Sequence, residues 1–189
     1  VLAEAGMEYS DLDAVVTGVG PGPFTGLRVG MATASALADA LSIPLHGICT
    51  HDAIAAAAEL DVEPAAAADE ATALVATDAR RKEIYWATYR VTDSGVQRIS
   101  GPAVTKPAEL EVELASTAEV IIPDCLAEQL PERFATLPHR AAHPTASALV
   151  AAADLEAEPA PVVPLYLRRP DAVPPKQQQL SAAIPKVEL

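Results

Sequence analysis

The sequence is poor in aromatic residues, cysteine and basic charge, and each deficit narrows the range of structures. Aromatic residues make up 4% of the 189 residues, so the core must consist mainly of small aliphatic side chains on closely packed helices and strands. The two cysteines, Cys49 and Cys125, lie far apart in the sequence, which favours a reducing compartment over a disulfide-stapled secreted domain. Thirteen basic against 26 acidic residues give a formal charge of −13, which disfavours strong direct binding to nucleic acid.

Long hydrophobic runs are also missing. No segment approaches the roughly 18 apolar residues that a bilayer-spanning helix needs, and no basic segment followed by an apolar one opens the chain. We therefore expect a cytoplasmic protein with no membrane association. The chain begins with Val1 rather than methionine, and residues 1–6 resemble the end of a helix, so we predict that an amino-terminal segment is missing.

Apolar residues make up 50% of the chain, which is enough for one compact domain or two small lobes. The pattern predicts a strand at residues 14–19, a helix at 24–41, a strand at 45–49 and a helix from Thr50 to about residue 60. The composition then shifts at residues 61–70, which we interpret as a linker. We therefore predict a first lobe at residues 1–70, a second lobe at 71–169 and a proline-rich flexible tail at 170–189.

The second lobe is predicted to contain a β-hairpin. Residues 73–77 are apolar, residues 83–91 are rich in β-branched and aromatic side chains, and polar residues separate the two runs. Apolar side chains occur on both faces of the second arm, which predicts a strand that is covered on both sides. Residues 120–123 are a further predicted strand, and residues 146–153 a predicted helix.

The helix at residues 24–41 is apolar on almost every side. One stripe, at spacings of three and four residues, consists of Phe24, Leu27, Met31, Ala34, Ala38 and Leu41. The other sides add Gly26, Val29, Gly30, Ala32, Ala36, Leu37 and Ala40, and leave a polar line of Arg28, Ser35 and Asp39. The pattern fits two interpretations equally well. Either the helix packs on its own sheet and on a second protein, with Gly26 and Gly30 allowing close approach, or it is a central core helix.

A loop rich in glycine and proline joins the first strand to this helix. Glycines between a strand and a helix can cradle a phosphate, because amides at a helix start bind anions. Here Pro21 and Pro23 have no amide hydrogen to donate, no lysine follows, and the spacing matches neither the P-loop nor the dinucleotide pattern. We therefore expect no bound cofactor, and we assign a structural role to Gly20, Gly22, Gly26 and Gly30.

Histidines raise the question of a metal site. His139 and His143 have the spacing of a zinc-protease helix, but the glutamate of that motif is missing and Pro144 interrupts the helix. A second group straddles a predicted strand end and consists of His46, Cys49 and His51. Because side chains alternate between faces along a strand, this group converges poorly on one ion, and we expect no metal. We interpret the polar residues 78–83 as a solvated turn and expect no catalytic residue.

Three segments carry a resemblance to a known family. They are Gly18-Val-Gly-Pro-Gly-Pro-Phe-Thr-Gly-Leu-Arg-Val-Gly30, Thr77-Asp-Ala-Arg80 with Glu83-Ile-Tyr-Trp-Ala87, and Pro164-Leu-Tyr-Leu-Arg168. In this order and spacing the sequence resembles the TsaB (YeaZ) family of tRNA threonylcarbamoyladenosine biosynthesis proteins, in an actinobacterial form. The resemblance covers essentially all of residues 1–169.

The resemblance implies an actin-like, ribonuclease H-like α/β fold in two lobes, the first of them incomplete at its amino terminus. It also implies a non-catalytic scaffold in tRNA N6-threonylcarbamoyladenosine (t6A) synthesis, which pairs with the transferase TsaD and works with the ATPase TsaE. A homodimer is possible in isolation, and strong direct tRNA binding is not expected. The predicted TsaD interface consists of Phe24, Leu27, Arg28, Met31, Ala34, Ser35, Leu37 and Asp39. Which stripe of the helix faces outward stays open.

Two other functions stay as alternatives. An M22-type glycoprotein metallopeptidase would hold zinc, and the broken motif at His139 and His143 counts against it. A free-standing actin-like ATPase would bind ATP and magnesium, and the lysine-free loop interrupted by proline counts against that function.

Overall fold

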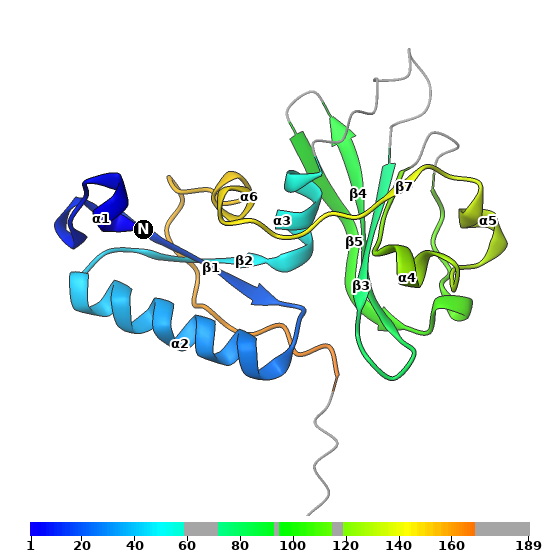
Figure 1. The fold of residues 1–189 in the computed structure, drawn as a ribbon, viewed down its shortest axis with the longest axis horizontal. Helices are drawn as coiled ribbons and strands as arrows, with labels where there is room; N and C mark the ends of the chain where they lie inside the picture. Colours follow the sequence, from blue (N-terminus) through cyan, green and yellow to red (C-terminus); the bar gives the residue numbers. More distant parts are fainter. Residues whose placement is uncertain (59–71, 93–94, 115–118, 169–189) are drawn as a thin grey trace, which may run out of the picture.

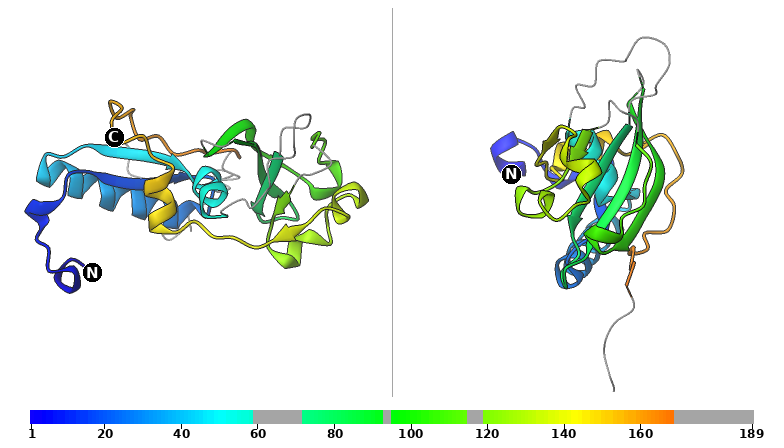
Figure 2. Two further views of the ribbon diagram at one scale, coloured as in Figure 1. Left: turned by 90° about the horizontal axis from the view of Figure 1, so that it is seen from above. Right: turned by 90° about the vertical axis from the view of Figure 1, so that its right-hand side faces the viewer.

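The structure, a computed structural model, describes residues 1–58, 72–92, 95–114 and 119–168. They form an elongated molecule with a small parallel sheet at one end and a larger mixed sheet at the other (Figure 1; from above in Figure 2). The predicted α/β class is therefore confirmed. The predicted linker, the predicted lobe boundary and the predicted proline-rich tail all lie outside the described residues.

The small sheet belongs to a strand–helix–strand unit. The chain first forms α1 (Leu2–Ala5) and the 3-10 helix η1 (Tyr9–Asp11), and the unit follows as β1 (Val15–Gly20), α2 (Phe24–Leu41) and β2 (Leu45–Cys49). β2 pairs in parallel with β1, and α2 packs chiefly on β1. The predicted elements match these bounds closely. α2 ends at Ser42, which adopts φ 54°, and Pro44 disfavours helical geometry at the residue before it.

The larger sheet has the strand order β5-β4-β3-β6-β7. Its strands are β3 (Thr72–Asp78), β4 (Ile84–Thr92), β5 (Gly95–Thr105), β6 (Glu119–Ile121) and β7 (His139–Arg140). β3, β4 and β5 pair antiparallel, whereas β6 is parallel to β3 and β7 is parallel to β6. The predicted hairpin is β3–β4, and the strand predicted at residues 120–123 is β6. Sequence analysis did not predict β5, which contains Gly101 and Pro102, two residues that disfavour a regular strand. These two residues lie opposite Ala87 in a β-bulge, which accommodates both.

Both faces of the larger sheet are buried, because neighbouring strand residues point to opposite sides. On one face, α3 (Thr50–Ala57) packs Ile54 against Val75 and Tyr89. On the other face, Leu74 and Ile84 pack beneath the segment with η2 (Pro107–Glu109), α4 (Asp124–Ala127) and α5 (Glu132–Ala135). α3 ends before the predicted limit near residue 60, which lies outside the described residues.

Two later segments return to the small sheet. α6 (Ala146–Ala151) lies beside α3 and β1, on the side of the small sheet opposite α2 (Figure 1). The hydroxyl of Thr145 caps α6 by accepting a hydrogen bond from the amide of Ala148 at 3.1 Å. Further along, the amide of Leu165 donates to the carbonyl oxygen of Val19 at 2.8 Å. Residues from the second half of the chain therefore complete the packing around β1.

Candidate protein-interaction surface

The loop before α2 has one position where only glycine fits. Gly20 adopts φ 99°, a left-handed conformation that other residues rarely take. A Cβ at this position would also lie 3.1 Å from Cδ2 of Leu27 and 3.4 Å from the carbonyl oxygen of Leu165. The other glycines to which we assigned a structural role have open space around them: Gly22, Gly26 and Gly30. The last two belong to α2 rather than to the loop.

The inner side of α2 packs on the chain itself. Met31, Ala34 and Ala38 are buried over β1, and Leu27 and Leu37 are half-buried beside them. Met31 and Ala34 belong to the predicted partner interface, and in this structure they pack on the chain's own sheet. The predicted interface stays a prediction.

The outer side of α2 is exposed and apolar. The outward strip consists of Thr25, Val29, Ala32, Ala36 and Ala40, which share one face at spacings of three and four residues. Val29 is 61% exposed, and Gly30 lies open on one flank of the strip. Arg28, Ser35 and Asp39 are exposed on the other flank. α2 is therefore not a central core helix.

Among the helices of the described residues, none combines the length and the hydrophobicity that a membrane span requires.

A compact cluster ties the start of α2 to the carboxyl-terminal end of the described chain. The rings of Phe24 and Tyr166 stack with centroids 4.9 Å apart and planes 30° apart. The guanidinium of Arg28 lies 3.9 Å from the centroid of Phe24, and its Nε donates to the hydroxyl of Tyr166 at 2.7 Å. Sequence analysis predicted Phe24 and Arg28 as site residues but missed Tyr166. The sequence feature that could have identified Tyr166 is its position in the segment Pro164-Leu-Tyr-Leu-Arg168, which resembles the TsaB family.

An open groove of about 380 Å³ lies between the start of α2, the β3–β4 turn and residues 165–168. Arg168 forms an ion pair with Glu83, which joins the carboxyl-terminal segment to the turn. Arg80 and Asp78 pair at 3.3 Å within the turn. Three consecutive residues of the turn have left-handed φ angles between 56° and 62°: Arg80, Arg81 and Lys82. They are exposed, as expected for a solvated turn.

A buried polar cluster joins the start of α3 to the larger sheet. His51 is fully buried, and its Nε2 lies 2.9 Å from Oγ1 of Thr77. Burial, and secondarily the charge of Arg98, lowers the pKa of His51 to about 4, so its ring is neutral at pH 7. The hydroxyl of Tyr89 donates to Oδ1 of Asp52 at 2.8 Å, and Arg98 lies 3.5 Å from the same oxygen. Burial first, and then Asp52, raises the pKa of Tyr89. These contacts therefore join α3 to the larger sheet.

The histidines that we considered as metal ligands lie on different elements. His46 is on β2, His51 is in the first turn of α3, and His139 is on β7 rather than on a helix. Cys49 and Cys125 are free thiols, and burial raises the pKa of Cys49, which disfavours the thiolate that binds metals. Among the described residues, no three side chains of His, Cys, Asp or Glu are arranged to hold a metal ion.

Comparison with protein families and known sequences gives consistent matches. The family model for TsaD, tRNA N6-adenosine threonylcarbamoyltransferase, matches residues 1–156. An uncharacterized protein of Mycobacterium leprae is 48% identical over 177 residues, which cover 92% of this chain and 43% of that protein. The Escherichia coli tRNA threonylcarbamoyladenosine biosynthesis protein TsaB is 35% identical over 97 residues, which cover 51% of this chain and 39% of that protein. The matched segments therefore cover less than half the length of either relative.

A solved structure supports the same grouping. The crystal structure of a Pseudomonas aeruginosa protein, described as uncharacterized and similar to the peptidase YeaZ, superposes with a TM-score of 0.72 at 27% identity. The superposition covers 88% of this chain and 79% of that one. Together with the family model, this likeness confirms the expected actin-like α/β fold.

Proposed function

The chain belongs to the family described as TsaD, tRNA N6-adenosine threonylcarbamoyltransferase, and its named relatives include TsaB (YeaZ) proteins. We propose that it is a non-catalytic scaffold subunit of t6A synthesis. In this proposal it binds a TsaD transferase as a heterodimer, and the pair works with TsaE in a larger assembly. In the absence of TsaD, the chain can form a homodimer through the outward strip of α2. The site of action is the cytoplasm.

The observation that carries the proposal is the outward strip of α2. Its side chains are small or apolar and exposed, with no charged residue among them. Small side chains let two helices approach closely, so their ridges and grooves can interlock. The polar flank of Arg28, Ser35 and Asp39 would form the rim around such a contact, as expected for a protein interface with an apolar centre. Covering this strip with a helix of TsaD would remove its apolar side chains from water, so we expect such a helix to bind here.

The non-catalytic part of the proposal rests on how the polar groups of the chain are engaged. Asp52 accepts a hydrogen bond from Tyr89 and forms an ion pair with Arg98, and His51 is fully buried, so neither side chain is available to a substrate. In the loop before α2, Pro21 and Pro23 have no amide hydrogen with which to bind a phosphate. We therefore assign the transfer chemistry to the partner.

The experiment is to mix the full-length protein with its cognate TsaD and to measure the mass of the mixture by size exclusion with light scattering. We expect a heterodimer at micromolar concentration, and we expect Ala36→Glu to abolish it because an unpaired charge would be buried. The matched control is Ala151→Glu on α6, which adds the same charge on the opposite side of the small sheet. If the wild-type mixture contains only separate proteins, the scaffold role is refuted. If Ala36→Glu binds like wild type, the outward strip is not the interface.

A functional assay separates this role from the two alternatives. Formation of t6A on tRNA should require both proteins together, whereas a metallopeptidase would hold stoichiometric zinc and a free-standing ATPase would bind ATP and magnesium in the absence of TsaD. Elemental analysis and calorimetric titration of the chain alone measure these two properties directly.

A further inference from the structure

Helix α2 carries two charged residues, and both lie on its polar flank: Arg28 near its start and Asp39 in its last turn. They are 11 residues apart, which is about three turns, so they lie on one line along the helix with about 16 Å between them. The opposite flank, with Gly26, Gly30 and Thr33, carries no charge. The outward strip is therefore bordered on one side alone by a positive and a negative charge.

Arg28 is held in place by two aromatic residues. Its Nε donates to the hydroxyl of Tyr166, and its guanidinium lies over the ring of Phe24. The two terminal nitrogens have no hydrogen-bond partner among the described residues, and they form a planar fork that matches the two oxygens of a carboxylate. The side chain is exposed, and no described carboxylate pairs with it. Arg28 is thus positioned in advance for an anionic group of another molecule.

Asp39 lies where a carboxylate is unfavourable for the helix itself. The carboxyl-terminal end of a helix carries a partial negative charge, which disfavours acidic side chains and favours cations. The last turn of α2 nevertheless contains Asp39 and no basic residue. Within the part of the chain that the structure describes, no basic side chain pairs with this exposed carboxylate. A cation from another molecule would relieve the repulsion between Asp39 and the helix end.

An open groove of about 660 Å³ lies beside Asp39, between the end of α2 and residues 42–45. The half-buried Ile43 and Leu45 give it an apolar wall. A lysine or arginine side chain packs its hydrocarbon stem on such a surface while its charged end reaches a polar partner, which Asp39 supplies here. Ala36, a member of the outward strip, also lines the groove, so the groove is continuous with that strip.

We propose that this charged flank of α2 selects the partner helix and sets its direction: Arg28 receives a carboxylate of TsaD, and Asp39 receives a lysine or arginine of TsaD. The inference rests on the proposed function, in which a helix of TsaD covers the outward strip. A partner helix with the complementary pair of charges fits in one direction, because the reversed direction places like charges against each other. An RNA phosphate is a poorer occupant, since the chain has a formal charge of −13 and Asp39 shares the flank with Arg28.

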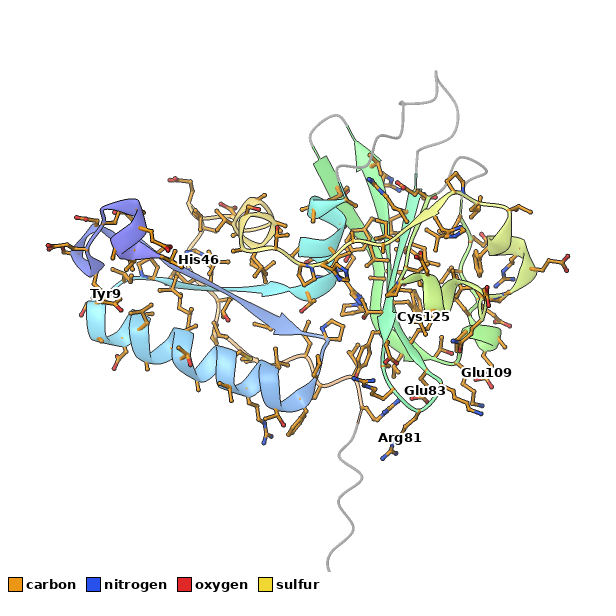
Figure 3. The ribbon with its side chains drawn as sticks, viewed as in Figure 1. Tyr9, His46, Arg81, Glu83, Glu109 and Cys125 are labelled. Atoms are coloured by element: carbon orange, nitrogen blue, oxygen red, sulfur yellow. The ribbon has the colours of Figure 1, made fainter. Side chains whose placement is uncertain are left out.

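The first test is calorimetric titration of TsaD with a charge-exchange variant of the full chain, Arg28→Glu with Asp39→Arg. This variant keeps the net charge and places like charges against both groups of the partner. It should bind about 30-fold more weakly or worse, because like charges facing each other across an interface are strongly unfavourable. The matched control, Lys106→Glu with Glu109→Lys, exchanges an exposed ion pair and should bind like wild type. Glu109 lies on the far side of the larger sheet from α2 (Figure 3).

The second test measures each contact by itself. Arg28→Gln and Asp39→Asn should each weaken TsaD binding by about two- to five-fold, the range for exposed ion pairs, and the loss should shrink at high salt. Arg28→Lys keeps the charge but lacks the planar fork, so it should recover only part of the affinity. Tyr166→Phe loses the hydrogen bond that positions Arg28, and its effect on binding should disappear in the Arg28→Gln background.

The outcomes separate this inference from the scaffold role. Weaker binding by the charge exchange, with a control that binds like wild type, supports both. If wild type does not bind TsaD, the scaffold role fails and the inference fails with it. If wild type and the charge exchange bind TsaD equally well, the inference alone is overturned.

Two further measurements on the same variants identify another occupant in that case. Self-association that Arg28→Glu abolishes and the charge exchange restores would assign the flank to a second copy of the chain, and would overturn the assignment to TsaD. Loss of tRNA binding by a complex whose affinity for TsaD is unchanged would assign Arg28 to RNA, and would overturn the inference as well.

Discussion

Replacing Gly30 with leucine should stabilise the folded chain and weaken its binding to TsaD. Gly30 lies inside α2, and a Cβ at this position would meet no atom within 4 Å. Leucine is about 0.8 kcal/mol more favourable than glycine in a helix interior, so the free energy of unfolding should rise by about that amount. For a chain of this size, the gain corresponds to a rise in Tm of about 2–3 °C.

The opposite effect on binding follows from the position of Gly30 beside the outward strip. In the complex, an isobutyl group at this position would occupy space that the partner helix needs for close approach. Overpacking of this kind costs about 1–3 kcal/mol, which corresponds to roughly 5- to 150-fold weaker binding. A substitution that merely damaged the fold would lower both the free energy of unfolding and the affinity for TsaD. We expect Gly30→Leu to raise the first and lower the second.

Two measurements check this prediction: thermal unfolding followed by circular dichroism, and calorimetric titration of TsaD with the variant. Gly30→Ala should raise stability similarly but reduce binding less, because its side chain is smaller. Ala151→Leu on α6 adds the same group to the opposite side of the small sheet and should leave binding unchanged. A lower Tm for Gly30→Leu would mean that the chain itself covers this side of α2. Wild-type affinity for TsaD would refute the assignment of the interface.

Three further predictions concern stability. Gly101→Ala should lower the free energy of unfolding by about 3 kcal/mol or more in urea, because φ is 87° and the new Cβ would lie 2.7 Å from the carbonyl oxygen of Trp86. A loss below about 1 kcal/mol would contradict the bulge geometry. Tyr89→Phe removes the hydrogen bond to Asp52 and should cost about 1.5–3 kcal/mol, and an unchanged urea midpoint would refute that role. His51 is buried neutral with its pKa lowered to about 4, so the unfolded chain binds the extra proton and stability falls as pH drops from about 6.5 to about 4. The loss should reach about 3 kcal/mol, and His51→Asn should flatten this part of the curve.

Sequence analysis succeeded where local chemistry decides the structure. The hydrophobic periodicity of residues 24–41, with Pro44 soon after, defined α2 and its neighbouring strands. The β-branched and aromatic residues of β4 predicted a strand buried on both faces, and the larger sheet has that arrangement. Local rules failed for β5, since Gly101 and Pro102 break a regular strand but are accommodated in a bulge formed with a neighbouring strand.

The sequence by itself determined that α2 is apolar on nearly all sides, that the loop before it is stiff, and that the chain resembles TsaB proteins. Only the tertiary structure decided which side of α2 is buried, because the packing of β1 beneath Met31 and Ala34 selects one stripe among several similar ones. The same holds for the groove between the start of α2, the β3–β4 turn and residues 165–168, whose residues come from three distant segments of the chain. Helical periodicity fixes which residues share a face, but the neighbours that cover that face come from long-range contacts that no local pattern encodes.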